Sequence, residues 1–136
     1  MQPTPYLFFN GNCADAMGAY ADILGGEIVA SMPASEMPPE YPVADDRKHW
    51  VLHSELRIGE GRIYASDSIM GDAEAMSGCS VSLSLTTRDQ AQSVYDRLAH
   101  GGEVQMPFAP TFWSAGFGTL TDRFGVKWMI GTDEAP

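Results

Sequence analysis

The chain has few basic residues, and this shortage excludes a class of function. Only eight of its 136 residues are Lys or Arg, against 18 Asp and Glu, so the formal net charge is -10. Binding to nucleic acid requires clustered Lys and Arg that neutralise phosphates. We therefore expect no nucleic-acid partner, and we attribute the excess of acidic residues to solubility.

The chain is also poor in cysteine and lacks long apolar runs and common catalytic motifs. Cys13 and Cys79 do not have the spacing of a metal-binding motif, and a disulfide between them stays open. Two free thiols in a reducing cytosol are the simpler interpretation. Residues 1–5 carry no positive charge and precede no long apolar run, so we expect no signal peptide, no membrane span and a cytoplasmic location. The sequence contains no Gly-x-Ser-x-Gly motif and no phosphate-binding loop.

A repeated tripeptide organises the rest of the sequence. Gly25-Gly26-Glu27 recurs as Gly101-Gly102-Glu103, and each copy follows a helix-like run and precedes a strand-like run. Gly61 and Gly125 also correspond, each opening a short apolar run. The first offset is 76 (101 minus 25) and the second is 64 (125 minus 61), and the Pro-rich segment Pro33 to Asp46 accounts for the difference. Two copies are too few for a solenoid, so we expect a paired-module domain.

Each copy predicts one helix and four strands in the order strand, helix, strand, strand, strand. The first copy has its strands at 6–9, 27–32, 49–58 and 62–66, and its helix from 12 or 13 to 24. The second has strands at 80–85, 104–108, 117–121 and 126–130, and a helix that opens with a capping box at Thr87 and Gln90. Each helix stripe must bury against a sheet face. We predict one α+β domain over 1–136, with module one at about 5–68, a linker at about 69–78 and module two at about 79–131.

The tandem βαβββ units carry a family resemblance. Pro5 to Cys13, His53 to Gly59, Phe112-Trp113 and Thr121 to Trp128 resemble the PhnB-like branch of the vicinal oxygen chelate superfamily, which includes glyoxalases, bleomycin-resistance proteins and dioxygenases. A 3-demethylubiquinone methyltransferase-like name is also attached to this branch, but no Gly-rich nucleotide-binding turn follows a strand here. The resemblance implies a curved, mixed and antiparallel sheet around a cavity for a small molecule.

In metal-dependent members of this superfamily, His and Glu side chains on four inward-facing strands hold a divalent ion. The corresponding places in this sequence hold residues that do not suit Zn²⁺, Ni²⁺ or Fe²⁺: Pro5 or Tyr6, Ala65, Ser80 or Ser82, and Met129. We therefore predict that the usual metal centre is missing and that no cofactor is required. Two further residues, each three after its glycine, are expected to pack beneath the helices: Tyr64 and Trp128.

His53 and Glu55 are the candidate catalytic residues. They alternate with Leu52, Ser54 and Leu56 along one strand, so they should share the face that looks into the concavity. Imidazole titrates near neutral pH, and Glu55 lies close enough to tune it as a general base or a donor to the substrate. Two alternatives stay open. In the first, His53 is a hydrogen-bonded strand histidine without a catalytic task. In the second, it forms a noncanonical metal site with Glu55 or Asp67.

We expect Phe8, Trp113 and Met129 to contact the ligand. Phe112 and Trp113 lie on the loop before the last hairpin, where they form either an aromatic wall of a pocket or part of the core. The first hypothesis is a small-molecule-binding protein without the superfamily's metal. The second is a glyoxalase-like lyase, isomerase or oxygenase with an altered site around His53 and Glu55.

We also expect a symmetric homodimer, the commonest assembly of small proteins and one that the resemblance implies. The segment Pro33 to Asp46 is long and has no predicted secondary structure, so it is the candidate arm that contacts the second chain. The alternative is a mobile lid over the pocket of a monomer.

Overall fold

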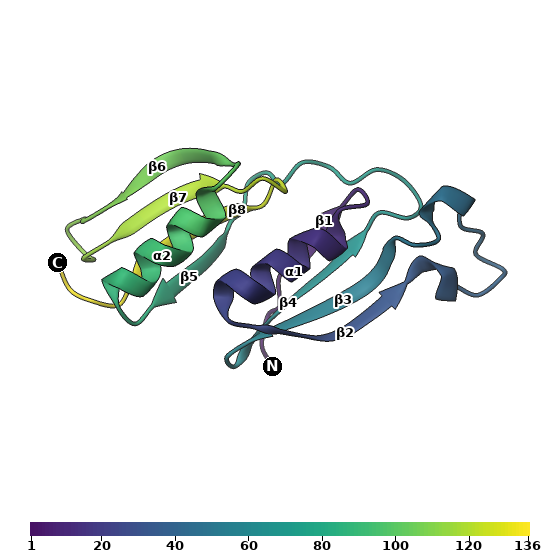
Figure 1. Cartoon of the computed structure of the whole chain (residues 1–136), viewed down its shortest axis with the longest axis horizontal. Helices are drawn as coiled ribbons and strands as arrows, with labels where there is room; N and C mark the ends of the chain where they lie inside the picture. The colour runs from purple at the N-terminus through teal and green to yellow at the C-terminus, as the bar shows by residue number, and fades with distance from the viewer. The chain divides into compact units, whose positions relative to one another are not determined.

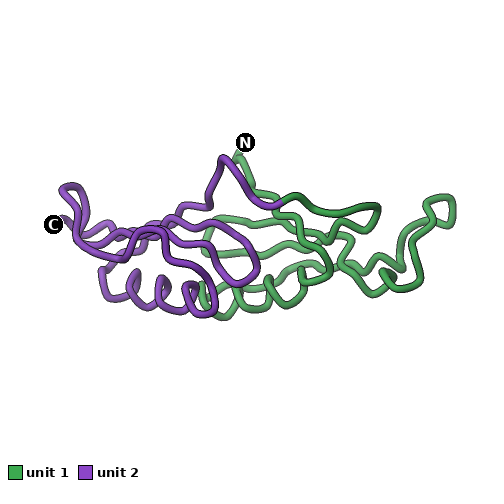
Figure 2. The backbone as a smooth tube through the Cα atoms, turned by 90° about the horizontal axis from the view of Figure 1, so that it is seen from above, with its two compact units in different colours: residues 1–74 green, residues 75–136 purple.

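The computed structural model describes all 136 residues, which form two compact units, 1–74 and 75–136 (Figure 2). Each unit contains one helix and a four-stranded sheet, in the order βαβββ (Figure 1). The α+β class and the two βαβββ modules are therefore confirmed.

Unit 1 contains five main elements: β1 (Tyr6–Phe9), α1 (Cys13–Leu24), β2 (Glu27–Pro33), β3 (Val51–Ile58) and β4 (Gly61–Asp67). The strand order is β1-β4-β3-β2, with β1 parallel to β4 and the other pairs antiparallel. Helix α1 packs against one face of this sheet, which leaves the opposite face without a helix (Figure 1).

Unit 2 repeats this arrangement with β5 (Val81–Leu85), α2 (Arg88–Ala99), β6 (Glu103–Ala109), β7 (Phe117–Thr121) and β8 (Lys127–Thr132). Its strand order, β5-β8-β7-β6, again pairs the first strand with the last in parallel. The predicted capping box is present, because the Thr87 side chain accepts from Gln90 N and the Gln90 side chain accepts from Thr87 N.

Each unit has its own core between helix and sheet. In unit 1 the largest fully buried side chains are those of Tyr20, Met17, Leu56 and Cys13, and in unit 2 they are those of Trp128, Leu120 and Ile130. The spacing of the buried residues on both helices is the apolar stripe that the sequence predicts.

The repeated Gly-Gly pair has the same two tasks in each unit. Gly25 and Gly101 follow the helices with φ of 67° and 74°, a left-handed conformation that glycine adopts without strain. A Cβ on Gly26 or Gly102 would lie 2.6 Å or 2.3 Å from a carbonyl oxygen of the neighbouring strand. The first glycine therefore ends the helix, and the second lets the next strand approach its partner.

Asp67 holds the start of α1, although Asn12, the residue before the helix, is of a type that often caps helices. The Asn12 side chain caps no amide of the helix. The buried Asp67 carboxylate instead accepts through Oδ1 from the amides of Gly11 at 2.7 Å and Cys13 at 3.0 Å. Its Oδ2 accepts from Val51 N at 2.8 Å, so one side chain at the end of β4 joins α1 to β3.

A second buried aspartate, Asp122, fixes the turn between β7 and β8. Its Oδ1 accepts from Phe124 N at 2.8 Å and Val126 N at 3.0 Å, and its Oδ2 accepts from the Trp128 indole at 2.9 Å. Asp122 is thus a turn residue that also satisfies the polar atom of a buried tryptophan.

This turn is longer than its counterpart in unit 1. The paired residues Thr121 and Lys127 enclose five residues, 122–126, whereas Arg57 and Arg62 enclose four, 58–61. The last strands of the two units, β4 and β8, are therefore offset by 65 residues. Phe9 at the end of β1 pairs with Asp67, and Leu85 at the end of β5 pairs with Thr132 (132 minus 67 is 65).

This one-residue difference corrects two expectations, because a shift by one moves a strand residue to the other face. Tyr64 matches Met129, not the buried Trp128, and it lies on the face opposite α1 rather than beneath the helix. Ala65, expected at an inward ligand position, is fully buried on the side of α1.

The segment between β2 and β3 is not free of secondary structure, contrary to the prediction for Pro33 to Asp46. It contains two short 3₁₀ turns, η1 (Ala34–Glu36) and η2 (Asp45–Arg47). Its two ends are joined by Ala34 N to Trp50 O at 2.7 Å and Ser35 N to Lys48 O at 2.9 Å.

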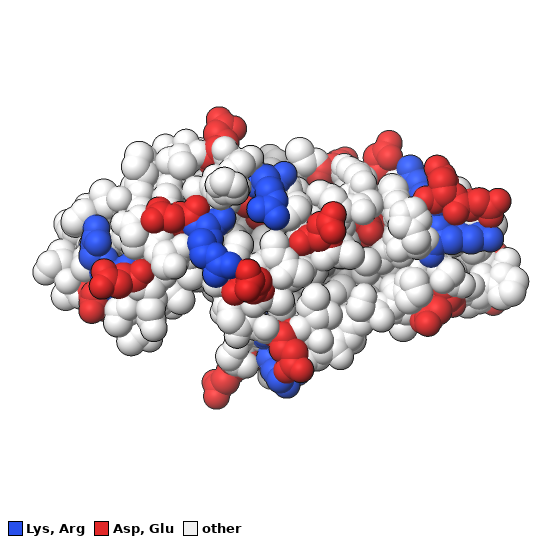
Figure 3. All heavy atoms as spheres, viewed as in Figure 1, with Lys and Arg blue, Asp and Glu red and all other residues white.

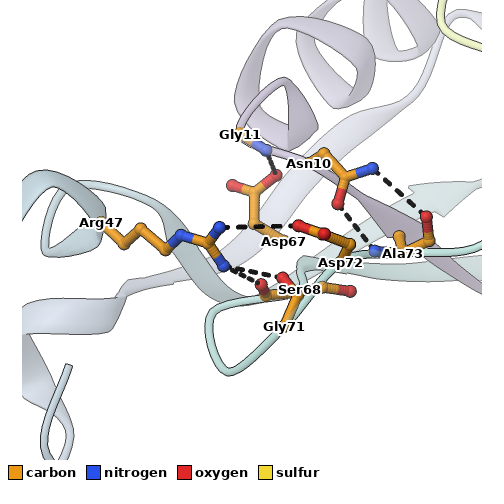
Figure 4. A network of polar contacts seen from close by, with 8 residues as sticks. All are labelled: Asn10, Gly11, Arg47, Asp67, Ser68, Gly71, Asp72 and Ala73. Carbon is orange, nitrogen blue, oxygen red and sulfur yellow. Dashed lines mark hydrogen bonds and ion pairs between the residues drawn. The ribbon is translucent and has the colours of Figure 1, made fainter. Parts of the chain in front are cut away.

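Arg47 fastens this segment to the chain that leaves β4 (Figure 4). Its Nη1 donates to the carbonyl oxygens of Ser68 at 3.1 Å and Gly71 at 2.7 Å, and its Nη2 lies 3.6 Å from the Asp72 carboxylate. The guanidinium also lies over the Trp50 ring, 4.4 Å from its centroid. The base of the segment is therefore held in place, and its exposed tip carries Tyr41.

No helix of the structure is long and apolar enough to cross a membrane. On the face drawn in Figure 3, Lys and Arg are scattered and stand among Asp and Glu rather than forming a basic patch.

Candidate functional site

The candidate site lies on the face of the unit 1 sheet opposite α1, which we call the helix-free face. The register lines up Tyr6 on β1, Tyr64 on β4 and Glu55 on β3, each paired with the next. His53 lies two residues before Glu55 and therefore points to the same side. Ser54 and Leu56, which alternate with them, are buried on the side of α1.

His53 is hydrogen-bonded through both of its ring nitrogens. Nδ1 lies 3.0 Å from the Tyr6 hydroxyl, and Nε2 lies 3.1 Å from Glu55 Oε1. The side chains of His53 and Glu55 are 31% and 30% exposed, so this pair is half-buried and accessible from solvent. The structure thus places His53 on the expected face and joins it to Glu55, as its spacing in the strand indicates.

Aromatic rings surround this polar chain. The Tyr6 ring centroid lies 5.0 Å from that of Phe8 and 5.6 Å from that of His53, and the His53 ring meets Tyr64 edge-on at 5.3 Å. Phe8 is 61% exposed, and Met32, the cross-strand partner of His53, is also exposed. The face therefore combines flat apolar surface with a small number of polar atoms, which is the composition of many small-molecule sites.

Of the residues predicted to form the site, the structure brings together Phe8, His53 and Glu55 in unit 1. Trp113 and Met129 belong to unit 2. Phe112 is 91% exposed and Trp113 is 52% exposed, so the interpretation of these two as core residues is wrong. Their rings meet edge-on at 4.8 Å.

The same row in unit 2 holds no ionisable side chain. Tyr6, Tyr64 and Glu55 are matched there by Ser82, Met129 and Thr119, which pair across β5, β8 and β7. Both units fold in the same way with these different rows. The aromatic and ionisable cluster of unit 1 is therefore not required by the fold.

Asp67 does not join this cluster, although the sequence offers it as a metal ligand beside His53. Its carboxylate lies on the side of α1, where it accepts from three backbone amides. The structure contains no group of three or more His, Cys, Asp or Glu side chains placed to hold a metal ion.

Both cysteines are free, and neither belongs to the cluster. Cys79 is exposed, whereas Cys13 is fully buried at the start of α1. Burial raises the pKa of the Cys13 thiol from 9.0 to about 12, and the nearby negative charge of Asp67 adds to the increase. A neutral, inaccessible thiol of this kind is a packing residue rather than a nucleophile.

Two members of the cluster, Tyr6 and Tyr64, are not among the site residues that the sequence predicts. Tyr6 and Phe8 alternate with the buried Leu7 and Phe9 along β1, a period that identifies which pair faces away from the helix. The spacing of Gly61 and Gly125 gives an offset of 64 between the last strands of the two units instead of 65, and it therefore predicts the wrong face of the sheet for Tyr64.

Residues 1–131 match the family described as 3-demethylubiquinone-9 3-methyltransferase. Protein YjdN of Escherichia coli is 33% identical over 138 residues, covering 96% of this chain and 94% of that protein. The crystal structure of protein PA1353 from Pseudomonas aeruginosa is 43% identical, with a TM-score of 0.89 over 97% of both chains.

More distant structures have the same fold. A PhnB protein from Bacillus cereus is 23% identical with a TM-score of 0.82, over 97% of this chain and 99% of that one. A glyoxylase/bleomycin resistance protein/dioxygenase domain from Frankia is 11% identical with a TM-score of 0.70, over 98% of both chains. Because the family match covers residues 1–131, the chain belongs to the family described as 3-demethylubiquinone-9 3-methyltransferase, and it shares its fold with the PhnB protein and with the glyoxylase/bleomycin resistance protein/dioxygenase domain.

Proposed function

We propose that this chain binds a small planar organic molecule on the helix-free face of unit 1. The observation that carries the proposal is the cluster of Tyr6, Phe8, His53 and Glu55, because exposed aromatic rings and an interlinked His–Glu pair stand together there. Large apolar side chains left on a protein surface are a common sign of a binding site. The matched row of unit 2 folds without an ionisable side chain.

We further propose that binding occurs without the divalent ion of the metal-dependent members. On the helix-free faces, the first and last strands of each unit offer Tyr6, Tyr64, Ser82 and Met129. Hydroxyl and thioether side chains are weak ligands for Zn²⁺, Ni²⁺ or Fe²⁺ compared with His and carboxylates. Elemental analysis after expression with added metal tests this directly, and one tightly held ion per chain would contradict it.

An NMR titration tests the binding proposal. A panel of small planar aromatic compounds is added to the protein while the ring signals of Tyr6, Phe8 and His53 are followed, with the Trp128 indole as a buried reference. We expect at least one compound to shift the three rings and to lose affinity in Phe8→Ala, while Phe112→Ala, a matched loss of an exposed ring in unit 2, keeps it. A panel that shifts none of the three rings would refute the proposal.

A second candidate function is general acid–base catalysis by a glyoxalase-like lyase, isomerase or oxygenase. It is favoured by the chain of hydrogen bonds from Tyr6 through His53 to Glu55, because a proton can move along such a chain. Turnover of a hemithioacetal, formed from a 2-oxoaldehyde and a thiol, is one assay. If catalysis occurs at this site, the turnover rate of the hemithioacetal should fall at least tenfold in His53→Gln.

We also propose that the protein acts in the cytoplasm as a homodimer. Two free cysteines fit a reducing compartment. The tip of the segment between β2 and β3 is exposed and carries Tyr41, and the Arg47 contacts hold its base, so the tip can serve as an arm toward a second chain. Light scattering after size exclusion should give twice the chain mass at micromolar concentration, and deletion of Pro38 to Val43 should weaken the association. A single-chain mass would refute the dimer.

A further inference from the structure

The hydrogen bonds of His53 determine which atom of the cluster can address a ligand. A carboxylate has no proton to donate at neutral pH, so Glu55 can only accept from His53 Nε2. A neutral imidazole with its proton on Nε2 has a lone pair on Nδ1. The Tyr6 hydroxyl, 3.0 Å from Nδ1, must then donate its proton to His53.

Both nitrogens of His53 are therefore occupied by protein groups, and neither is free for a ligand. The Tyr6 hydroxyl, in contrast, donates its only O–H to His53, and the lone pairs of its oxygen stay available to accept hydrogen bonds from other partners. Tyr6 is 39% exposed, and its ring lies beside the more exposed ring of Phe8. With a neutral His53, the Tyr6 oxygen can therefore only accept from a ligand, as can the second carboxylate oxygen of Glu55, whereas the Tyr64 hydroxyl can also donate.

We infer that Tyr6 is the specificity-determining residue of this site, and that the site takes planar aromatic molecules that carry an N–H or O–H donor and no negative charge. This inference rests on the proposed binding function and names the class of ligand. The ligand's ring packs on Phe8 and Tyr6, and its donor meets the Tyr6 oxygen. Anionic ligands are disfavoured by the Glu55 carboxylate and by a chain of net charge -10.

The same hydrogen-bond pattern assigns His53 and Glu55 a positioning role. His53 orients the Tyr6 proton away from the ligand, and Glu55 selects the imidazole tautomer that makes this orientation possible. Replacement of His53 by Phe keeps a ring beside Tyr6 and Tyr64 but removes the acceptor at Nδ1. The Tyr6 hydroxyl is then free to donate, and the preference for donor ligands should disappear.

The test compares two probes of nearly the same shape, indole and benzofuran, by NMR titration or calorimetry at pH 8. Indole has an N–H donor where benzofuran has an oxygen. One neutral hydrogen bond contributes about 0.5–1.5 kcal/mol, so we expect the wild-type chain to prefer indole by about 2- to 13-fold. The preference should vanish in Tyr6→Phe through a loss of affinity for indole, and should vanish or reverse in His53→Phe.

Tyr64→Phe is the matched control, because it removes the neighbouring phenol hydroxyl and should keep the preference. Equal affinity of the two probes for the wild-type chain would overturn the inference and leave the proposed function standing. Loss of the preference in Tyr64→Phe but not in Tyr6→Phe would also overturn it. If neither probe binds, the inference fails, and the proposed function fails with it only if the whole aromatic panel also leaves Tyr6, Phe8 and His53 unshifted.

Discussion

Replacement of Asp67 by Asn should destabilise unit 1 although the two side chains have the same shape. The carboxylate is 3% exposed and accepts from the amides of Gly11, Cys13 and Val51. An Asn carbonyl in place of Oδ1 can keep the first two amides, but its NH₂ group would face Val51 N, donor against donor. Loss of one charge-assisted hydrogen bond and an unpaired buried amide together cost about 2–4 kcal/mol.

Urea unfolding followed by circular dichroism measures this cost. Total stabilities of small domains are about 5–15 kcal/mol, and urea slopes are about 1–3 kcal/mol per molar, so the midpoint should fall by about 1–2 M. Asp46→Asn is the control, since it removes the same charge from an exposed position and should stay within about 0.5 kcal/mol of wild type. A free energy of unfolding of Asp67→Asn equal to that of Asp46→Asn would refute the assignment of Asp67 as the joint between α1 and β3.

The same substitution has a second readout at Cys13. The negative charge of Asp67 is the smaller of the two causes that raise the pKa of this thiol, after burial. In native wild-type protein at pH 8, a thiol reagent should modify Cys79 quickly and Cys13 only on unfolding. In Asp67→Asn the pKa of Cys13 should fall, and its modification rate should rise relative to that of Cys79.

The remaining predictions concern pH, a loop anchor and one glycine. The folded-state pKa of Cys13 lies above its ordinary value of 9.0, so this thiol ionises first in the unfolded chain. The free energy of unfolding should therefore fall as pH rises from 9 toward 12, by up to about 1.4 kcal/mol per pH unit, and Cys13→Ala should flatten that part of the curve of unfolding free energy against pH. Arg47→Lys loses the forked contacts to two carbonyls and the stacking on Trp50, and should lower stability by about 1–2 kcal/mol and speed proteolysis within 37–44. Gly11→Ala places a Cβ 2.9 Å from the Trp50 ring at φ +95° and should cost more than Gly59→Ala, where φ is +56° and the space is open, as thermal unfolding of the two variants would measure.

Most of the fold could be predicted from the sequence because its signals are local. The apolar stripes of the two helices, the alternation in β3 and the repeated Gly-Gly pair each reflect a period or a backbone conformation that a few neighbouring residues determine. The order of elements in one module could then be checked against the other.

The errors arose where a distant part of the chain decides the outcome. Asn12 has the right side chain for an N-cap, but Asp67, 54 residues beyond Cys13, supplies the acceptor instead. The Gly61 and Gly125 spacing hides one extra residue in the second turn, and that single residue moved Tyr64 from the helix-free face to the core in the prediction.

The candidate site was predicted only in part for the same reason. His53 and Glu55 are two apart on one strand, so their alternation indicates their shared face. The contact between His53 and Tyr6 depends on the register of β4 between β1 and β3, which the sequence does not display. A direct role of His53 toward a ligand stays a prediction, and the structure adds that both of its ring nitrogens lie within hydrogen-bond distance of Tyr6 and Glu55.

The most direct test is a long-range ¹H–¹⁵N spectrum of the neutral His53 imidazole, recorded without and then with indole. The Tyr6–His53–Glu55 arrangement predicts a proton on Nε2 and a lone pair on Nδ1 in the free protein. Indole should shift the Nδ1 signal, because a donor on the Tyr6 oxygen strengthens the hydrogen bond from Tyr6 to His53. A proton on Nδ1 in the free protein, or a spectrum that indole leaves unchanged, would contradict this account of the site.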